Sequence, residues 1–375
     1  MYSTSSITSS LHGHLWQNRP DRPVLYFSIK ALHENYQRFV SSFDGLVTYA
    51  VKANTSPLVL DNLASAGLTT FDVASPSEMQ TVRAAVPNAV LHYHNPVRSL
   101  VEIVEAKRFG VQSWAIDSQA ELDKLGALPT GSEIAVRLHV PVAGAAYDFG
   151  EKFGAGPELA TMLLRCVKLR GLTPSLTFHP GTQCAEHAAW TRYIEVAHAV
   201  SQQAEINLER LNVGGGFAAW RDHKAPNLER VLTRICDHTK ALFGDKSPKL
   251  VCEPGRAMVA SAFTLATRIK ALRGRQTLFL NEGIYGLLSE FRDLGVSQRY
   301  HLWRDGQKLT TPSADYTVFG PTCDSIDQLP SSLHLPKSVQ EGDYLLFSDI
   351  GAYSLSLATT FNGYGDCEIV SVTDL

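Results

Sequence analysis

The sequence of 375 residues predicts a (β/α)8 barrel of the TIM type, followed by a C-terminal all-β domain. Between residues 46 and 255, eight short β-type segments alternate with segments of helical periodicity. Eight such units over about 215 residues match the number and length that this barrel needs. After residue 262, strand-like segments follow one another with little amphipathic helix between them, which is typical of an all-β domain.

The chain before the barrel offers one strand. The segment PVLYFSI, residues 23–29, is apolar at its centre, and we expect it to join the later β domain. The residues before it are polar and rich in Ser and Thr, so we expect them to be loosely structured. They also lack the continuous apolar run of a secretory signal.

The barrel strands are read from eight apolar runs that end in polar or turn residues. In chain order they are LVTYAVKAN (46–54), TTFDVAS (69–75), AVLHYHN (89–95), QSWAID (112–117), EIAVRLHV (133–140), PSLTFHPG (174–181), RLNVGGG (210–216) and KLVCEPG (249–255). Among the helical segments, 186–203 places Trp190, Tyr193 or Ile194, Ala197 and Val200 on one apolar stripe. A doubly wound sheet is the alternative, but it usually has fewer units and an early phosphate-binding fingerprint.

The β domain is read from four further runs, namely FTLATRIKAL (263–272), QTLFLNEGIYG (276–286), ADYTVFGPT (314–322) and DYLLFSDIGAYS (343–354). We therefore expect the barrel to occupy residues 30–260 and the β domain residues 261–375, completed by a strand from within residues 1–29. A Gly/Ala-rich stretch at 141–156 has the composition of a mobile loop, and no role is assigned to it.

Composition narrows the class of protein. A net charge of −3 leaves no basic surplus for phosphates, so nucleic acid is not an expected partner. No apolar run reaches the length of about 18 residues that a membrane helix needs. The six cysteines form no CxxC pair, which favours reduced thiols in a cytoplasm. The thirteen histidines show no HExxH or Cys/His spacing, so no metal site is expected.

The active site of such a barrel lies at the carboxyl ends of its strands. The polar residues at these ends are Lys52, Asp72, His94 with Asn95, Asp117, Arg137, His179, Gly214 to Gly216, Glu253 and Arg256. This set contains an amine that can form an imine, glycines whose N–H groups can approach an anion, an arginine for a phosphate, and a carboxylate for a ring nitrogen. Together these groups are what pyridoxal phosphate needs, although each of them alone is commonly a rim, turn or loop residue.

Longer motifs strengthen this interpretation. They are YAVKAN (49–54), FDVASPSEMQ (71–80), HNP (94–96), KFGAG (152–156), FHPGTQ (178–183), NVGGGF (212–217), EPGR (253–256), FGPTCDSID (319–327) and DIGAYSLSLATTFNGY (349–364). In this order they resemble the ornithine decarboxylase family, which belongs to the alanine-racemase-like (fold type III) pyridoxal phosphate enzymes. The resemblance spans residues 22 to 366.

The resemblance implies a role for each matching residue in the barrel. Lys52 corresponds to the lysine that binds the cofactor covalently, and Glu253 to the acid on the ring nitrogen. His179 corresponds to the histidine that stacks on the ring. The other implied cofactor contacts are Asp72 with Glu78, Arg137, Thr182 in place of a serine, Gly214, Gly215, Gly216, Gly255, Arg256 and Tyr353. An acid at position 253 keeps the ring protonated and favours decarboxylation over racemisation.

The β domain is expected to supply residues to a second subunit. The resemblance implies that Cys323 protonates the product carbanion and that Asp324 binds the distal amine of the substrate, both reaching into the site of the partner in a homodimer. The segment 287–300 departs from the family pattern, and Glu290 or Asp293 could be its second acid. Solvated helix-end acids are the alternative interpretation.

These features predict a pyridoxal-phosphate-dependent decarboxylase of a basic L-amino acid, with ornithine as the leading substrate and putrescine, a polyamine precursor, as the product. The divergent 287–300 segment leaves lysine or a larger carboxylated intermediate, such as a siderophore precursor, as alternatives. A non-catalytic regulatory homologue is a further alternative, against which the presence of Lys52, Glu253, Arg256 and Cys323 counts.

Overall fold

The structure is a computed structural model that describes residues 4–142, 152–310 and 312–375. Most of the Gly/Ala-rich stretch at 141–156 therefore lies outside the described residues. Two units divide the chain. The barrel unit comprises residues 35–218 and 226–258, and the β unit comprises the N-terminal residues through Glu34, residues 219–225 and residues 259–375.

The barrel unit contains a parallel sheet of nine strands in the order β3-β11-β10-β9-β8-β7-β6-β5-β4. They are β3 (Gly45–Val47), β4 (Tyr49–Ala50), β5 (Thr70–Val73), β6 (Val90–Tyr93), β7 (Ser113–Ile116), β8 (Glu133–Arg137), β9 (Thr173–Thr177), β10 (Arg210–Asn212) and β11 (Lys249–Cys252). The first predicted strand is split at Thr48 into β3, which pairs with β11, and β4, which pairs with β5. The sheet thus nearly closes on itself, and the predicted barrel is confirmed.

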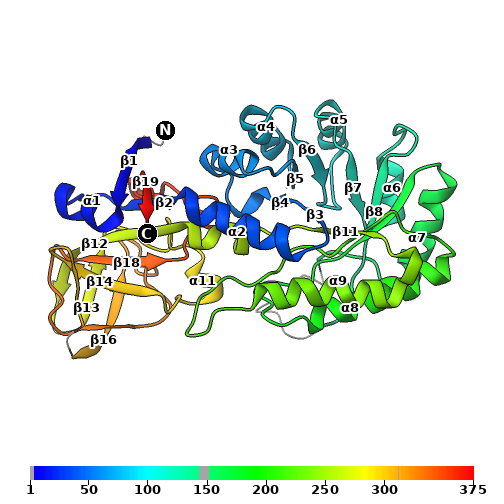
Figure 1. The fold of residues 1–375 in the computed structure, drawn as a ribbon. Coiled ribbons are helices and arrows are strands. Elements are labelled where there is room, and N and C mark those ends of the chain that lie inside the picture. Colours follow the sequence, from blue (N-terminus) through cyan, green and yellow to red (C-terminus); the bar gives the residue numbers. More distant parts are fainter. Residues whose placement is uncertain (1–3, 143–151, 311) are drawn as a thin grey trace. The chain divides into compact units, whose positions relative to one another are not determined.

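Helices surround these strands in Figure 1. They are α2 (Ile29–Ser42), α3 (Pro57–Ser65), α4 (Pro76–Ala85), α5 (Leu100–Arg108), α6 (Gln119–Lys124), α7 (Pro157–Leu169), α8 (Ala188–Ala204), α9 (Leu228–Phe243) and the short α10 (Arg256–Val259). Ser75, Ser99 and Ser118 cap α4, α5 and α6 by accepting a hydrogen bond from the third helical N–H.

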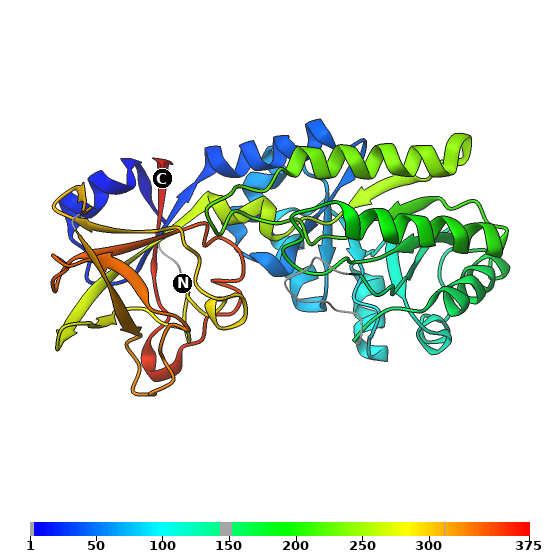
Figure 2. The same cartoon turned by 90° about the horizontal axis from the view of Figure 1, so that it is seen from below.

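Two helix pairings show how the outer layer packs. The predicted stripe of α8 is buried, with Trp190 and Ile194 fully covered. Helices α2 and α9 lie side by side in Figure 2, where the guanidinium of Arg38 donates two hydrogen bonds to the carboxylate of Glu229, at 2.6 and 3.1 Å. An apolar inner face and a charged outer face are what this helical layer requires.

The β unit is a ten-stranded, mostly antiparallel sheet. Its elements are β1 (Thr4–Ser10), α1 (Leu11–Asn18), β2 (Val24–Ser28), β12 (Phe263–Arg273), β13 (Thr277–Leu280), α11 (Phe291–Leu294), β14 (Tyr300–Arg304), β15 (Gln307–Lys308), β16 (Ser313–Phe319), β17 (Leu333–Pro336), β18 (Tyr344–Ser348) and β19 (Glu368–Asp374). Strand β2 pairs with β12 and β19, so the prediction that the segment 23–29 joins this sheet is confirmed.

From Thr4 on, the N-terminal segment forms regular secondary structure, contrary to the expectation from its composition. Strand β1 pairs in parallel with β19, and the side chain of Ser10 caps α1. Helix α1 buries Leu11 and Leu15 in a cluster that also contains Tyr26 and Val370. The polar composition was misleading because an edge strand of Ser and Thr needs only backbone hydrogen bonds on one side.

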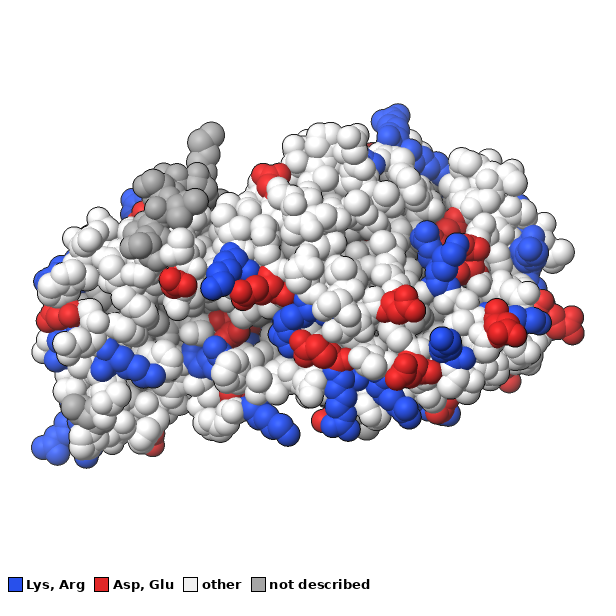
Figure 3. Space-filling model, in the orientation of Figure 1, with Lys and Arg blue, Asp and Glu red and all other residues white. Residues whose placement is uncertain are grey.

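Charged side chains of both signs are interspersed over the face drawn in Figure 3. All six cysteines are free thiols. None of the described helices has the length and hydropathy to cross a bilayer.

Candidate active site

Lys52 lies directly after the first barrel strand, in a 3-10 turn formed by Val51–Ala53. The strand end is fixed by its neighbour, because the N–H of Thr48 donates to the carbonyl of Cys252 and the N–H of Ala50 to that of Pro254. The hydroxyl of Tyr49 donates to the carbonyl of Asn54 at 2.9 Å and closes the turn. The lysine side chain is therefore held at the mouth of the barrel while its own backbone is tied to the strands.

A cavity of about 310 Å³ opens at this end of the barrel unit. Five of the predicted cofactor residues line it, namely Lys52, Asp72, Arg137, His179 and Glu253. All five come from the carboxyl ends of different strands, as expected for this fold. The structure thus gathers the amine, the arginine and the acids around one space.

Glu253 is the most tightly held acid in the cavity. Its Oε1 accepts a hydrogen bond from Nδ2 of Asn212 at 2.5 Å and lies 2.5 Å from Nδ1 of His94. The Nε2 of His94 lies 2.9 Å from Oγ of Ser113. Asn212 is oriented in turn, because its Oδ1 accepts from the N–H of Gly214.

These contacts divide the acids of the site into two charge states. Burial alone would raise the pKa of Glu253, but the charge and hydrogen bond of His94 and the amide of Asn212 lower it to about 2. Burial and the neighbouring Glu253 raise the pKa of Asp72 to about 8. A carboxylate oxygen of Asp72, a carboxylate oxygen of Glu253 and a ring nitrogen of His94 all lie within 4.8 Å of one another. At neutral pH Glu253 is nevertheless ionised, whereas Asp72 is protonated.

His179 and Arg137 provide a neutral ring and a cation. The pKa of His179 is well below its ordinary value, because the ring is buried and faces the charges of Lys52 and Arg137. Its Nδ1 accepts the N–H of Gly181 at 3.2 Å, so the neutral ring carries its proton on Nε2. Arg137 stands 5.0 Å from the centre of the Phe153 ring, a cation–π distance.

The glycine run following β10 packs against the ends of both neighbouring strands. Gly214 and Gly216 have φ values of +68° and +84°, which favour glycine. A Cβ on Gly214 would stand 2.1 Å from the carbonyl oxygen of Phe178, and one on Gly215 would stand 2.6 Å from that of Glu253. Side chains are thereby excluded, and this surface consists of backbone alone, as an anion cradle requires.

We expect Gly214→Ala to lower the free energy of unfolding by more than about 2 kcal/mol, since left-handed strain and a backbone clash add together. Gly126→Ala is the matched control, because its φ is +57° and nothing lies within 4 Å of its Cβ position. Thermal unfolding of both variants measures the difference. Equal losses would mean that the close approach at Gly214 is not maintained in solution.

The remaining predicted barrel residues surround this cradle and the Lys52 turn. Thr182 is buried in the loop after β9, and Arg256 is buried at the start of α10. A Cβ on Gly255 would stand 3.0 Å from the methyl group of Ala53, next to Lys52. Glu78 accepts the N–H of Ala74 at 2.7 Å, at the start of α4.

The β unit holds the predicted residues that come from the later motifs. Cys323 is exposed, in the loop after β16. The carboxylate of Asp324 accepts a hydrogen bond from the hydroxyl of Tyr285 at 2.7 Å and another from the N–H of Ile326 at 3.0 Å. These two bonds hold the pKa of Asp324 below its ordinary value, so it is an anion at neutral pH. Tyr353 follows β18 with a φ of +59°.

Glu290 and Asp293 do not share an environment. Glu290 is 3% exposed and forms an ion pair with Arg221 at 2.8 Å. Asp293 is exposed on the short helix α11. The arginine engages the Glu290 carboxylate within the β unit, and a substrate role for Glu290 or Asp293 stays a prediction.

Sequence reasoning gave no role to several residues that the structure places in or next to these sites. They are His94, Asn212, Ser113, Lys152, Phe153 and Tyr285. A signal existed for two of them, because Asn212 opens the NVGGGF motif and Lys152 opens the KFGAG motif. The link between His94 and Glu253 joins residues 159 positions apart and leaves no local pattern.

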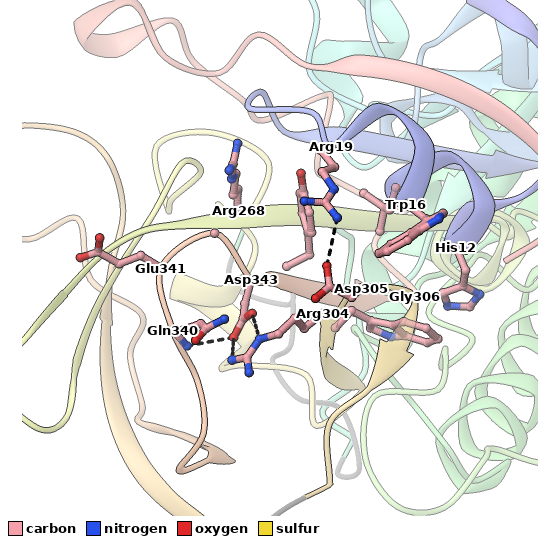
Figure 4. A pocket seen from close by; sticks show the side chains of 14 residues that line it. His12, Trp16, Arg19, Arg268, Arg304, Asp305, Gly306, Gln340, Glu341 and Asp343 are labelled. Atoms are coloured by element: carbon pink, nitrogen blue, oxygen red, sulfur yellow. Dashed lines mark hydrogen bonds and ion pairs between the residues drawn. The ribbon is translucent and has the colours of Figure 1, made fainter.

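A second cavity, of about 300 Å³, lies entirely within the β unit (Figure 4). Its arginines already face carboxylates. Arg304 forms hydrogen bonds to both oxygens of Asp343 at 2.6 and 2.8 Å, and Arg19 pairs with Asp305 at 3.2 Å. None of the residues that line this cavity is a lysine, and no glycine run reaches it, so it does not share the features of the barrel site.

The barrel site fits pyridoxal phosphate on its own chemistry. A lysine amine and an ionised carboxylate line one cavity, and a glycine run that no Cβ could enter reaches the same strand ends. Oδ1 of Asp72 is buried without a hydrogen-bond partner among the described residues, as a group awaiting a polar ligand would be. Amine, anion cradle and ring-nitrogen partner are the three requirements of this cofactor.

Comparison with known proteins identifies the family. Residues 28–260 match the family described as pyridoxal-dependent decarboxylase, pyridoxal binding domain. The lysine/ornithine decarboxylase of Selenomonas ruminantium is 33% identical over 353 residues, which cover 91% of this chain and 87% of that protein. The ornithine decarboxylase of Mus musculus is 31% identical over 342 residues, covering 84% and 73%.

A solved structure gives the same result for the fold. The arginine decarboxylase of Paramecium bursaria Chlorella virus superposes with a TM-score of 0.87, over 96% of this chain and 99% of that chain, at 24% identity. The chain therefore belongs to the pyridoxal-dependent amino-acid decarboxylases, with residues 28–260 as its pyridoxal-binding domain.

Proposed function

We propose that the protein decarboxylates a basic L-amino acid, with ornithine as the leading substrate, and that Lys52 and Glu253 carry its cofactor. The observation that carries this proposal is the single cavity lined by the Lys52 amine and the ionised Glu253 carboxylate, within the pyridoxal-binding domain. An acid opposite the ring nitrogen suits decarboxylation, because it stabilises a protonated ring.

Pyridoxal phosphate supplies an electron sink for the carbanion that remains when carbon dioxide leaves. Lys52 would hold the cofactor through its amine, and Glu253 would accept a hydrogen bond from the ring nitrogen. His179, whose neutral ring lines the cavity, would cover one face of the cofactor ring without adding charge. The phosphate would bind to the bare backbone of Gly214 to Gly216, with Arg256, Thr182 and Tyr353 as further donors.

The β unit would complete the site of a second subunit in a homodimer. Cys323 is exposed, and its loop presents Ile326 with 64% of its surface accessible, which suits an interface. Across that interface, the Cys323 thiol would deliver a proton to Cα of the product. The ionised Asp324, fixed by Tyr285, would bind the distal cation of the substrate.

The proposed substrate is chosen from the ionised Asp324 carboxylate and from the names of the related decarboxylases. A carboxylate held by two hydrogen bonds suits a cationic tail, and the relatives are named for ornithine and for lysine or ornithine. Lysine is the second candidate because the Selenomonas protein carries both names. With ornithine the product would be putrescine, a step in polyamine synthesis.

A panel of ornithine, lysine, arginine and diaminopimelate, assayed for carbon dioxide release with the cofactor added, tests the substrate. We expect ornithine to give the highest kcat/KM. A higher value for lysine would replace ornithine by the second candidate. Activity on diaminopimelate alone would contradict a cationic tail and the role of Asp324.

Cys323→Ala is expected to slow turnover and to divert part of the product to an aldehyde, because a proton delivered by water to the cofactor instead of to Cα would leave the amino group on the cofactor and release the rest of the substrate as an aldehyde. Product analysis by mass spectrometry measures the aldehyde-to-amine ratio. Cys166→Ala, a half-buried cysteine of α7, is the control and should leave this ratio unchanged. An unchanged ratio in Cys323→Ala would contradict its role as proton donor.

Mixing a variant that lacks Lys52 with an impaired variant that lacks Cys323 tests whether the active sites are shared. If Lys52 and Cys323 act from different subunits, equal amounts of Lys52→Ala and Cys323→Ala chains form mixed dimers in half of the cases. Each mixed dimer then has one intact site of two, so about one quarter of the wild-type activity returns. No recovery after subunit exchange would indicate that both residues act within one chain.

A further inference from the structure

Two buried histidines, His92 and His94, lie two positions apart at the end of β6. His92 lies in the strand and His94 directly follows it, so both side chains lie on the same face of the strand. Their rings stack with centroids 5.3 Å apart, and both residues are less than 8% exposed. Although they are neighbours, their contacts differ, because only His94 reaches the carboxylate of Glu253.

The contacts of His94 fix its ring from both sides. Nδ1 lies 2.5 Å from Oε1 of Glu253, and Nε2 lies 2.9 Å from Oγ of Ser113. Oε1 of Glu253 also accepts from the amide of Asn212, so both of these bonds use the same oxygen. The second oxygen, Oε2, is then the one available to a ligand in the cavity.

The charges around His94 favour its cationic form. Burial alone would keep the ring neutral, but the charge of Glu253 and its hydrogen bond raise the pKa of His94 above its ordinary value. His92 faces His94 and Glu253 but stays neutral, because burial and the positive charges of His94 and Arg210 lower its pKa to about 3. One cation and one neutral ring therefore stand side by side.

We propose that His94 is a positioning residue for the cofactor: as a cation hydrogen-bonded to Oε1, it keeps Glu253 ionised, so that the proton shared with the ring nitrogen of pyridoxal phosphate resides on the ring. This inference rests on the proposed contact between Glu253 and that nitrogen. It adds a residue that sequence reasoning left without a role, and it explains why a carboxylate buried beside Asp72 remains charged.

The physical reason is a choice between two arrangements with the same number of protons. Either Glu253 is an anion and the ring nitrogen holds the proton, or Glu253 is a neutral acid that donates to a neutral ring. Burial favours the neutral acid, because it disfavours the charged form of a carboxyl group. Nδ1 of His94 lies 2.5 Å from Oε1 of Glu253, so the positive charge of His94 favours the arrangement with the negative charge on Glu253.

Holoenzyme loaded with pyridoxal phosphate labelled with ¹⁵N in its ring provides the test, because the ring ¹⁵N chemical shift reports protonation independently of turnover. We expect a protonated ring in the wild type and a shift toward the neutral value in His94→Ala. His94→Gln, which keeps a donor but loses the charge, should fall between them. Loss of a hydrogen bond to a charged group changes the ratio of the two arrangements about tenfold or more.

Two further variants distinguish a failure of the proposed role of His94 from a failure of the proposed contact between Glu253 and the ring nitrogen. His92→Phe replaces a neutral buried ring and should leave the ¹⁵N shift at the wild-type value. Glu253→Gln should give a neutral ring. If Glu253→Gln moves the shift and the His94 variants do not, His94 has no positioning role. If Glu253→Gln leaves the shift unchanged, the proposed contact of Glu253 with the ring fails instead.

If the variants fail to bind the cofactor, the charge of His94 can still be measured directly in the wild-type holoenzyme. In wild-type holoenzyme labelled with ¹⁵N-histidine, the His94 signals are assigned by their loss in His94→Gln. An imidazolium at pH 7.5 is the expected result. A neutral His94 imidazole at that pH overturns the proposal.

Discussion

Lys52→Ala is expected to reduce decarboxylation to background, a loss on the order of 10⁴-fold or more. The reason is that Lys52 is the amine at the end of the first barrel strand that lines the cavity together with Glu253 and His179. The purified variant should also lack the yellow colour and near-visible absorbance of a cofactor bound to lysine. Absorbance spectra and turnover measured on the same preparation provide the check.

Lys152→Ala is the matched control, because Lys152 lines the same cavity and lies 5.1 Å from the centre of the Phe153 ring. Its loss should leave the absorbance intact. Borohydride reduction of the holoenzyme, followed by peptide mapping, should place the cofactor on the peptide that contains Lys52. Attachment to Lys152, or full turnover by Lys52→Ala, would contradict the assignment.

The fold could be predicted because its signals are local. Each barrel strand lies within an apolar run of six to nine residues that ends in polar or turn residues, and α8 shows its buried stripe at helical spacing. The strand ends could be read in the same way, since a parallel barrel brings all carboxyl ends to one face. Lys52, Asp72, Arg137 and Glu253 thus meet in one cavity, as their positions in the sequence led us to expect.

Pairings between distant segments could not be predicted. His94 and Glu253 share a hydrogen bond across 159 positions, and Arg221 neutralises Glu290 across 69 positions. No periodicity encodes either contact, because each depends on which loops the sheet brings together. The same limit explains the N-terminal strand β1, whose partner β19 lies at the other end of the sequence.

Glu253→Gln is expected to lower kcat/KM by about 10² to 10³-fold, because an amide keeps the shape of the carboxylate but loses the charge that holds a proton on the ring. It also leaves the His94 cation buried without its closest counter-ion. Breaking such a buried pair costs about 3 kcal/mol or more of folding free energy. Steady-state kinetics and urea unfolding at pH 7 measure the two losses.

The free energy of unfolding at acidic pH should show how the ionised Glu253 contributes to stability. The pKa of Glu253 is lowered from 4.5 to about 2 in the folded protein, so its contribution to stability is present above pH 4.5 and is lost as the pH falls toward 2. The stability difference between wild type and Glu253→Gln should therefore shrink over that range.

Glu133→Gln separates a catalytic loss from a merely structural one. Glu133 also forms an ion pair, with Arg210 at 2.8 Å, which is partly buried, but it lies at the first residue of β8, the strand end opposite to the active site. Both variants should therefore unfold at lower urea concentration than the wild type. Only Glu253→Gln should lose kcat/KM and the protonated-ring signal, because only Glu253 lines the cavity with Lys52. Equal kinetic losses in the two variants would mean that the barrel tolerates no broken pair, and that the charge at position 253 has no separate role.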